Sequence, residues 1–126
     1  GTRDLSPWLA INSAIDFYKG FGEAEVKSYM HNLAWSSAEM IAEEWGVELN
    51  LKKDMFASMV PIPLPGTVKG GDEERIELVK MLWEKYQVEV AITDPTDFLW
   101  ARISAQIYNE ESDYKRLAEA VKAELM

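Results

Sequence analysis

The stretch Phe98-Leu-Trp-Ala-Arg-Ile-Ser-Ala105 decides the fold of this 126-residue chain. It is apolar apart from one arginine and one serine, which is typical of a buried β-strand. Successive side chains of a strand point to opposite faces. One face therefore holds Phe98, Trp100, Arg102 and Ser104, and the other holds Leu99, Ala101, Ile103 and Ala105.

A second strand is expected over residues 88–92, where valine, isoleucine and alanine dominate. The short polar turn at residues 94–97 joins it to the first stretch, so the two strands are antiparallel. A third strand is expected over residues 55–60. Prolines at positions 61, 63 and 65 follow it, so this segment is a loop or lies at the edge of a sheet.

Four helices are expected around these strands. The first begins at Ser6-Pro7 and ends at Gly20 and Gly22, and the second covers residues 23–45 and stops at Gly46. Asp72 is expected to cap the third, over residues 73–86, and Asn109 the last, over residues 110–125. The apolar spacing predicts that the third buries Ile76, Val79, Leu82 and Trp83, and that the last buries Leu117, Val121 and Leu125.

This order of elements predicts one α+β domain over residues 1–126. A small, mainly antiparallel three-stranded sheet is covered by helices on one face, giving a two-layer sandwich. The second helix is long for a domain of this size. Part of it is therefore expected to pack on something outside the chain.

The charge and the cysteine count exclude several classes of function. The chain carries 13 basic and 22 acidic residues, a net charge of −9, so neither nucleic acid nor an anionic membrane surface is an expected partner. It has no cysteine, which excludes disulfides, zinc–thiolate sites and thiol nucleophiles within it. The lack of cysteine also favours a cytoplasmic location.

Most polar motifs in the chain are best explained by structure. His31 has no recognisable orienting partner, so a packing role is favoured over catalysis. Asp94 and Asp97 flank a proline, where Asx-turn capping is favoured over acid–base or metal chemistry. The acids at positions 110, 111 and 113 open a helix, where negative charge is stabilising. The glycines of residues 66–71 lack the order of a phosphate-binding loop, so this segment is expected to be a mobile connector.

Arg102 is the exception, because its place in an apolar strand demands an anionic partner. One interpretation is an internal salt bridge with one of the many acids of the chain. The other is an anion-binding site for a ligand. The residues alone leave both open.

Three segments in order resemble one known family. The string Ala101-Arg-Ile-Ser-Ala-Gln-Ile-Tyr-Asn109, with the acidic helix after it, resembles the end of the class V aminotransferases, which are fold-type-I enzymes that use pyridoxal phosphate. The opening Gly1-Thr-Arg-Asp4, followed by Ser6-Pro-Trp-Leu-Ala10, and the segment Phe56–Leu64 are also similar to it. The match is to the isopenicillin-N-epimerase-like and cysteine-desulfhydrase-like branch, and it covers essentially the whole chain.

The resemblance implies how the chain is organised. It corresponds to the C-terminal small domain of a longer enzyme, with residues 1–46 as helices linking to a large domain and residues 47–126 as the α+β small domain. That enzyme is expected to be a homodimer. Trp8, Trp35 and Trp100 are candidates for an apolar surface that packs on the large domain.

The resemblance also implies residue roles. Arg102 stands where the family binds the α-carboxylate of an amino-acid substrate, and Gly1 and Thr2 stand where it reaches the cofactor phosphate of the neighbouring subunit. The catalytic residues, including the lysine that binds pyridoxal phosphate, belong to the large domain. No catalytic residue and no metal ligand is therefore expected here, and the chain alone is expected to be inactive without bound cofactor.

The reaction type is narrowed by the missing cysteine. Cysteine desulfurases of this superfamily carry a persulfide-forming cysteine in a loop that here is only Thr93-Asp-Pro-Thr-Asp97. Epimerase, lyase (desulfhydrase) and transaminase chemistry remain open. The alternative from another class is a non-catalytic α+β interaction module.

Overall fold

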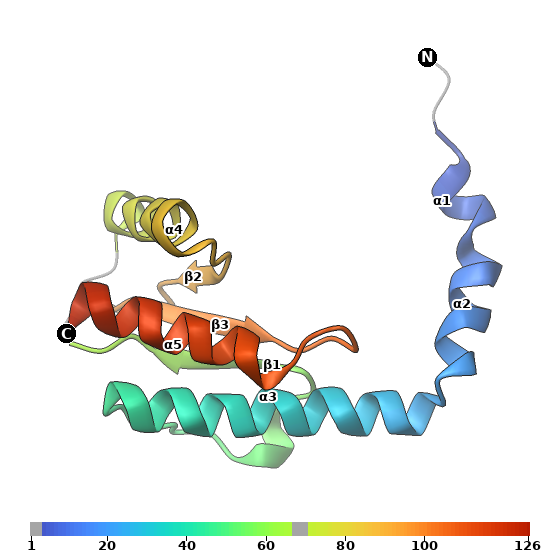
Figure 1. The fold of residues 1–126 in the computed structure, drawn as a ribbon, viewed down its shortest axis with the longest axis horizontal. Coiled ribbons are helices and arrows are strands. Elements are labelled where there is room, and N and C mark those ends of the chain that lie inside the picture. The colour runs from blue at the N-terminus through green and yellow to red at the C-terminus, as the bar shows by residue number, and fades with distance from the viewer. Residues whose placement is uncertain (1–3, 67–70) are drawn as a thin grey trace.

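The computed structural model describes residues 4–66 and 71–126 and has the expected α+β architecture (Figure 1). Its elements follow in the order α1 (Ser6–Leu9), α2 (Ile11–Gly20), α3 (Glu23–Trp45), the 3₁₀ turn η1 (Lys53–Met55), β1 (Met59–Pro63), α4 (Asp72–Tyr86), β2 (Ala91–Thr93), β3 (Trp100–Ser104) and α5 (Glu111–Leu125). Within these residues no helix is long and apolar enough to cross a lipid bilayer.

The three strands form one antiparallel sheet in the order β1-β3-β2. The prolines of β1 are tolerated because this strand lies at the edge and pairs only with β3, so a missing N–H can face away from the ladder. The expectation of an edge is thus confirmed. The expected start at Met55 is wrong, because residues 53–55 form η1 and pairing begins at Met59.

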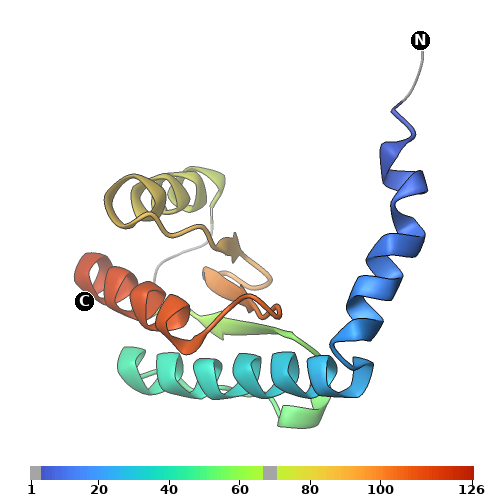
Figure 2. The ribbon, with the colours of Figure 1, turned by 45° about the vertical axis from the view of Figure 1, so that its right-hand side comes forward.

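The expected alternation along β3 is confirmed. Leu99, Ala101 and Ile103 are buried, whereas Arg102 and Ser104 are exposed. The buried face of the sheet packs on the helices, with α3 beside β1, α4 beside β2 and α5 between the two helices (Figures 1 and 2). The hydrophobic core lies between these two layers, and its largest fully buried residues are Ile41, Ile62, Leu82, Leu99, Val60 and Val121.

Helix α3 has the predicted bounds because both of its ends are encoded locally. Gly46 adopts a left-handed conformation with φ 64°, which suits glycine and ends the helix. The predicted caps of α4 and α5 are wrong by one residue. Asp72 lies inside α4 and pairs with Arg75 at 2.7 Å, and Glu110 is the N-cap of α5.

The predicted buried face of α4 is wrong in part. Leu82 is buried and Val79 is half-buried, but Ile76 and Trp83 are 59% and 51% exposed, and Leu78 is buried instead. Helix α4 carries apolar residues on more than one face, so their spacing does not decide which face is buried. Packing of α4 on β2 and α5 buries the face with Leu78 and Leu82. The strand expected over residues 88–92 is also shorter in the structure, because residues 88–90 are not part of the sheet and β2 begins at Ala91.

The first 19 described residues, 4–22, form an N-terminal arm that extends away from the rest of the molecule (Figures 1 and 2). A single helix was expected, but the arm holds two, α1 and α2, with a break at Ala10. Ser6 does not cap it, since the N-cap is Leu5 and Asp4 accepts a hydrogen bond from the Ser6 N–H at 2.9 Å. No residue of either helix is buried within the chain.

Candidate functional site

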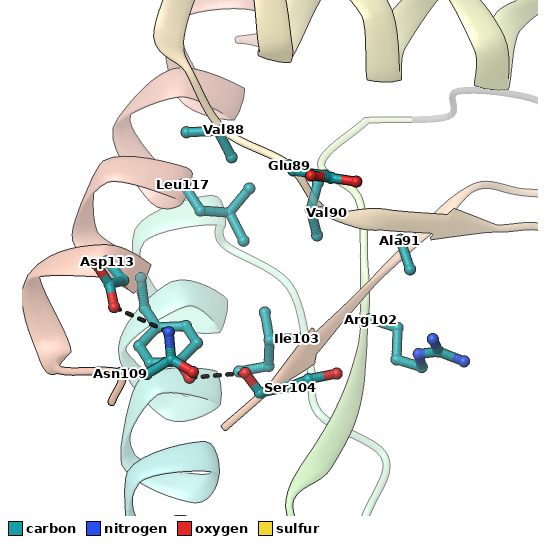
Figure 3. Close-up of a pocket in the computed structure, with 11 residues that line it drawn as sticks. Val88, Glu89, Val90, Ala91, Arg102, Ile103, Ser104, Asn109, Asp113 and Leu117 are labelled. Atoms are coloured by element: carbon teal, nitrogen blue, oxygen red, sulfur yellow. Dashed lines mark hydrogen bonds between the residues drawn. The ribbon is translucent and has the colours of Figure 1, made fainter. Parts of the chain in front are cut away.

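The exposed side chain of Arg102 lines a hollow of about 200 Å³ (Figure 3). The hollow lies between β3, the segment that leads into β2, and the first turns of α5. Besides Arg102 its lining residues are Val88, Glu89, Val90, Ala91, Ile103, Ser104, Asn109, Asp113, Tyr114 and Leu117. The guanidinium predicted from the sequence to bind an anion is therefore placed on a concave surface.

The hollow forms because β2 is shorter than β3. Ala91 is the first residue of β2 and pairs with Arg102, so the residues before Ala91 diverge from Ile103 and Ser104. The Tyr114 hydroxyl donates a hydrogen bond of 2.9 Å to the Ser104 carbonyl oxygen. Burial of this side chain raises the pKa of Tyr114 to about 12, so the phenol stays protonated and holds the floor of the hollow in place.

Two further polar residues of the hollow, Asn109 and Asp113, form hydrogen bonds that cap the start of α5. The Asn109 amide nitrogen donates to Asp113 Oδ2 at 3.0 Å, and its oxygen accepts from the Gln106 N–H at 3.0 Å. Asp113 Oδ2 also accepts from the Glu110 N–H at 3.1 Å, as part of a capping box. Asn109 and Asp113 therefore shape the wall, and the helix-opening role expected for the acids at positions 110 and 113 is confirmed.

Arg102 forms no ion pair with any acidic side chain, all of which lie in the described ranges. The internal salt bridge, one of the two interpretations that the sequence left open, is therefore not formed. The backbone of Arg102 is held by β-strands on both sides, and its planar guanidinium can bind a carboxylate or phosphate through two parallel hydrogen bonds. The arrangement is chemically suited to binding an anion.

The other residues singled out in the sequence lie elsewhere. Gly1 and Thr2 are outside the described residues. His31 Nδ1 is 2.8 Å from the Ala57 carbonyl oxygen, and its ring centroid is 5.6 Å from that of Phe56, which is a packing arrangement. The described ranges contain no group of three or more His, Asp or Glu side chains that could hold a metal ion.

The turn between β2 and β3 differs in detail from the prediction. Thr96 Oγ1 accepts hydrogen bonds of 3.2 Å from the Phe98 N–H and from Trp100 Nε1, whereas Asp94 and Asp97 accept none from described residues. Asx capping is thus wrong as the explanation, although the turn itself is present. Thr96 provides the capping oxygen instead.

The three tryptophans proposed for an outer apolar surface lie on three different elements. Trp8 is 73% exposed on α1, whereas Trp35 and Trp100 are half-buried. The Trp35 ring stacks on Phe56 with a centroid distance of 5.5 Å. They are neither all solvated nor all locked in the core, so the expected apolar surface towards a large domain stays a prediction.

A pyridoxal-phosphate site needs a lysine to bind the cofactor and a pocket that encloses its ring. Lys19, Lys53 and Lys80 each line a shallow hollow, and each is exposed on an open surface. None of them lines the hollow with Arg102. The hollow therefore offers a guanidinium that can bind an anion, but no lysine that could hold the cofactor.

Comparison with known proteins gives several relatives over nearly the whole chain, although no protein-family model matches it. It is 38% identical over 128 residues to an isopenicillin N epimerase of Amycolatopsis lactamdurans, covering 97% of the chain and 30% of that protein. It is 32% identical over 133 residues to a probable chloroplastic L-cysteine desulfhydrase of Arabidopsis thaliana, covering 96% and 28%. A hercynylcysteine sulfoxide lyase of Schizosaccharomyces pombe is 30% identical over 121 residues, covering 95% and 30%.

The chain thus spans about 30% of the length of these relatives. The relatives come from bacteria, plants and a fungus. Their named activities act on different compounds. The chain belongs to the class V aminotransferase family, in the group that contains isopenicillin N epimerases and L-cysteine desulfhydrases.

Proposed function

We propose that this chain is the small-domain part of a pyridoxal-phosphate-dependent enzyme that acts on an amino acid, and that Arg102 binds the carboxylate of the substrate. The observation that carries the proposal is the unpaired Arg102 guanidinium on the wall of the hollow. A rigid, bidentate clamp on a carboxylate fixes the orientation of the reacting carbon.

The reaction is an epimerisation, a lyase reaction or a transamination. The relatives are named as epimerases, desulfhydrases and a lyase, which supports this range. When bound, pyridoxal phosphate supplies the electron sink for such chemistry. The residues of this chain bind and orient the substrate, while the cofactor and its lysine are held by the remaining length of the enzyme.

The N-terminal arm and α3 are proposed to pack on that remaining part, and on a second subunit of a homodimer. The support is the large apolar surface of the arm, where Leu5, Trp8, Leu9, Phe17 and Phe21 are all more than half exposed. Exposed apolar surface of this extent is typical of an interface. Gly1 and Thr2 precede the arm and are proposed to contact the cofactor phosphate of the partner subunit.

The test uses the complete enzyme encoded by the surrounding reading frame, in which a lysine of the upstream part must bind the cofactor. We expect Arg102→Gln to lower kcat/KM about 10- to 100-fold, mainly through KM, because a charged hydrogen-bonded pair is lost. Arg102→Lys should restore only part of the loss, since a lysine cannot form the bidentate contact.

Arg116→Gln is the matched control, because Arg116 is exposed on α5 and lines no hollow with Arg102. It should leave kcat/KM unchanged. Equal effects of the two glutamine variants, or no effect of Arg102→Gln, would reject the carboxylate role. An enzyme that neither binds pyridoxal phosphate nor turns over any amino acid would favour the non-catalytic interaction module instead.

The 126-residue chain alone provides a second test. Incubated with pyridoxal phosphate, it is expected to give no stable new absorption band in the visible region and no turnover. A stable band formed by this chain alone would contradict the assignment of the cofactor lysine to the rest of the enzyme.

A further inference from the structure

Three polar side chains of the hollow are free to meet a ligand. Arg102, Ser104 and Glu89 all line it, and none of their side chains forms a hydrogen bond or ion pair with a described residue. The remaining polar residues of the wall, Asn109, Asp113 and Tyr114, are held in contacts with the chain itself. Glu89 was not singled out from the sequence, where it reads as one exposed acid in a strand.

Glu89 and Arg102 line the same hollow. Ala91 pairs with Arg102, and Glu89 precedes Ala91 by two residues, in the segment that leads into β2. Figure 3 shows the Glu89 and Arg102 side chains extending in the same direction, with Ala91 between them.

Opposite charges so close on one wall normally attract each other, yet they form no ion pair here. Glu89 also lines a second groove, together with Arg75 and Lys80. These two cations have acidic partners of their own, Asp72 and Glu84. Among the acidic side chains that line the hollow, Glu89 is thus the one without a partner, and the single arginine that lines it, Arg102, has none either. The pair is arranged to receive a ligand that carries both charges.

We infer that Glu89 binds a cationic group of the ligand whose carboxylate is bound by Arg102. The inference rests on the proposed function and narrows its substrate class to amino acids whose side chain ends in a cation. The α-amino group is needed for the cofactor, so the cation that reaches Glu89 is the distal one. Small Ala91 between the two charges leaves room for the apolar part of the side chain.

Three six-carbon probes test the inference on the 126-residue chain, followed by nuclear magnetic resonance of the backbone and the Arg102 side chain. ε-Aminocaproate, caproate and adipate share one carboxylate and differ only at the far end, which is an ammonium, a methyl or a second carboxylate. None carries an α-amino group that could react with a cofactor. We expect the affinity to fall in the order ε-aminocaproate, caproate, adipate, with shifts at residues 89 and 102.

The variants separate the inference from the proposed function. Glu89→Gln should weaken ε-aminocaproate about three- to five-fold, to the level of caproate, the range of an exposed ion pair, and should leave caproate unchanged. Arg102→Gln should weaken all three probes. Glu48→Gln, at an exposed glutamate outside the hollow, is the matched control and should change none.

Results that differ from these expectations reject either the cation site at Glu89 or the carboxylate site at Arg102. If Arg102→Gln weakens the probes while Glu89→Gln preserves the preference for ε-aminocaproate, the cation site is wrong and the carboxylate site stands. If Arg102→Gln leaves all three affinities unchanged, the carboxylate site fails as well. Absence of any shift at residues 89 and 102 up to the solubility limit of ε-aminocaproate also overturns the inference.

Discussion

The N-terminal arm and the rest of the chain, residues 23–126, use apolar residues in opposite ways. In residues 23–126 the apolar side chains of α3, α4, α5 and the sheet meet in one core, with Ile41, Ile62 and Leu82 fully buried. In the arm, helical spacing produces an apolar stripe with nothing from the described chain against it. Periodicity therefore specifies that a segment is helical, but burial depends on whether a partner surface exists.

The difference also separates two kinds of stability. Residues 23–126, the body of the molecule, are held by contacts between residues far apart in sequence. In one of them Trp45 Nε1 donates to the Ala118 carbonyl oxygen at 3.1 Å. The arm depends on local hydrogen bonds and on contacts outside the described residues. Isolated helices of this length are marginal in water. We therefore expect the arm to respond weakly, and the body strongly, to equivalent substitutions.

The largest effect is expected from a pair of leucines. Leu82→Ala, at a side chain with 0% exposure, should lower the free energy of unfolding by about 2–5 kcal/mol through lost burial and a cavity. Leu9→Ala, at a side chain with 81% exposure in the arm, should change it by less than about 0.5 kcal/mol. Urea denaturation of both variants measures the contrast, and similar losses in the two would show that the arm is packed in solution.

Alanine substitutions at two glycines, one in the body and one in the arm, are expected to have opposite effects. Gly46→Ala should destabilise the body by about 1 kcal/mol, because alanine is strained at φ 64° although no atom blocks its Cβ. Gly20→Ala should increase the helix content of the arm, because Gly20 ends α2 without a positive φ and alanine favours helix. Denaturation and far-ultraviolet circular dichroism measure the two effects, and a gain from Gly46→Ala would contradict the left-handed cap.

A pair of tyrosines tests the floor of the hollow. Tyr114→Phe should lower the free energy of unfolding by about 1 kcal/mol, because the bond to the Ser104 carbonyl is lost. Tyr108→Phe, at a largely exposed side chain, should have no measurable effect. The raised pKa of Tyr114, about 12 against the ordinary 10.0, adds stability that is complete below pH 10 and is lost as the pH rises through 12.

That last effect is measured by following tyrosinate absorbance while the pH is raised. The wild type should show a late ionisation step with a pKa of about 12, which belongs to Tyr114. In Tyr114→Phe the late step should be missing. If the late step persists in the variant, Tyr114 is not the buried phenol.

The smallest effect concerns two glutamates. Tyr86 donates to Glu124 Oε1 at 2.6 Å and Lys85 at 3.0 Å, and these bonds across α4 and α5 lower the pKa of Glu124 below its usual 4.5. This adds stability that is present above pH 4.5 and is lost as the pH falls through the lowered pKa. Unfolding measured against pH should therefore show that the deficit of Glu124→Gln shrinks in acid.

Glu23→Gln is the matched control at the junction with the arm. Glu23 pairs only with Lys27, one helical turn away, and both side chains are well exposed. Its deficit should be smaller than that of Glu124→Gln at neutral pH, because a local exposed pair contributes little. A larger deficit at Glu23 would contradict the view that contacts across the body dominate.

Features that depend on neighbouring residues were predictable from the sequence. The bounds of α3 follow from Gly46, which stops a helix by its own backbone preference, and the two faces of β3 follow from strand geometry alone. The edge position of β1 follows from prolines that cannot donate. Which of Asp94, Thr96 and Asp97 would hold the turn was not predictable, because all three can cap.

The site was predictable only in its central residue. Arg102 stood out as a charge in an apolar strand, but the hollow needs Tyr114 from α5 and Glu89 from the segment before β2. Nothing local marks Glu89, since an exposed acid in a strand is common. The position of Glu89 becomes informative only once Ala91 is known to pair with Arg102, which brings the segment before β2 to the hollow.

The sequence by itself determined the kinds of elements, their order, the two-faced central strand and the family. These follow from local backbone preferences and from the spacing of apolar residues. Only the tertiary structure decided which stripe of α4 is buried, that the arm has no partner within the described chain, and that Arg102 is unpaired beside Glu89. Those features depend on which distant surfaces meet, and local preferences carry no information about that.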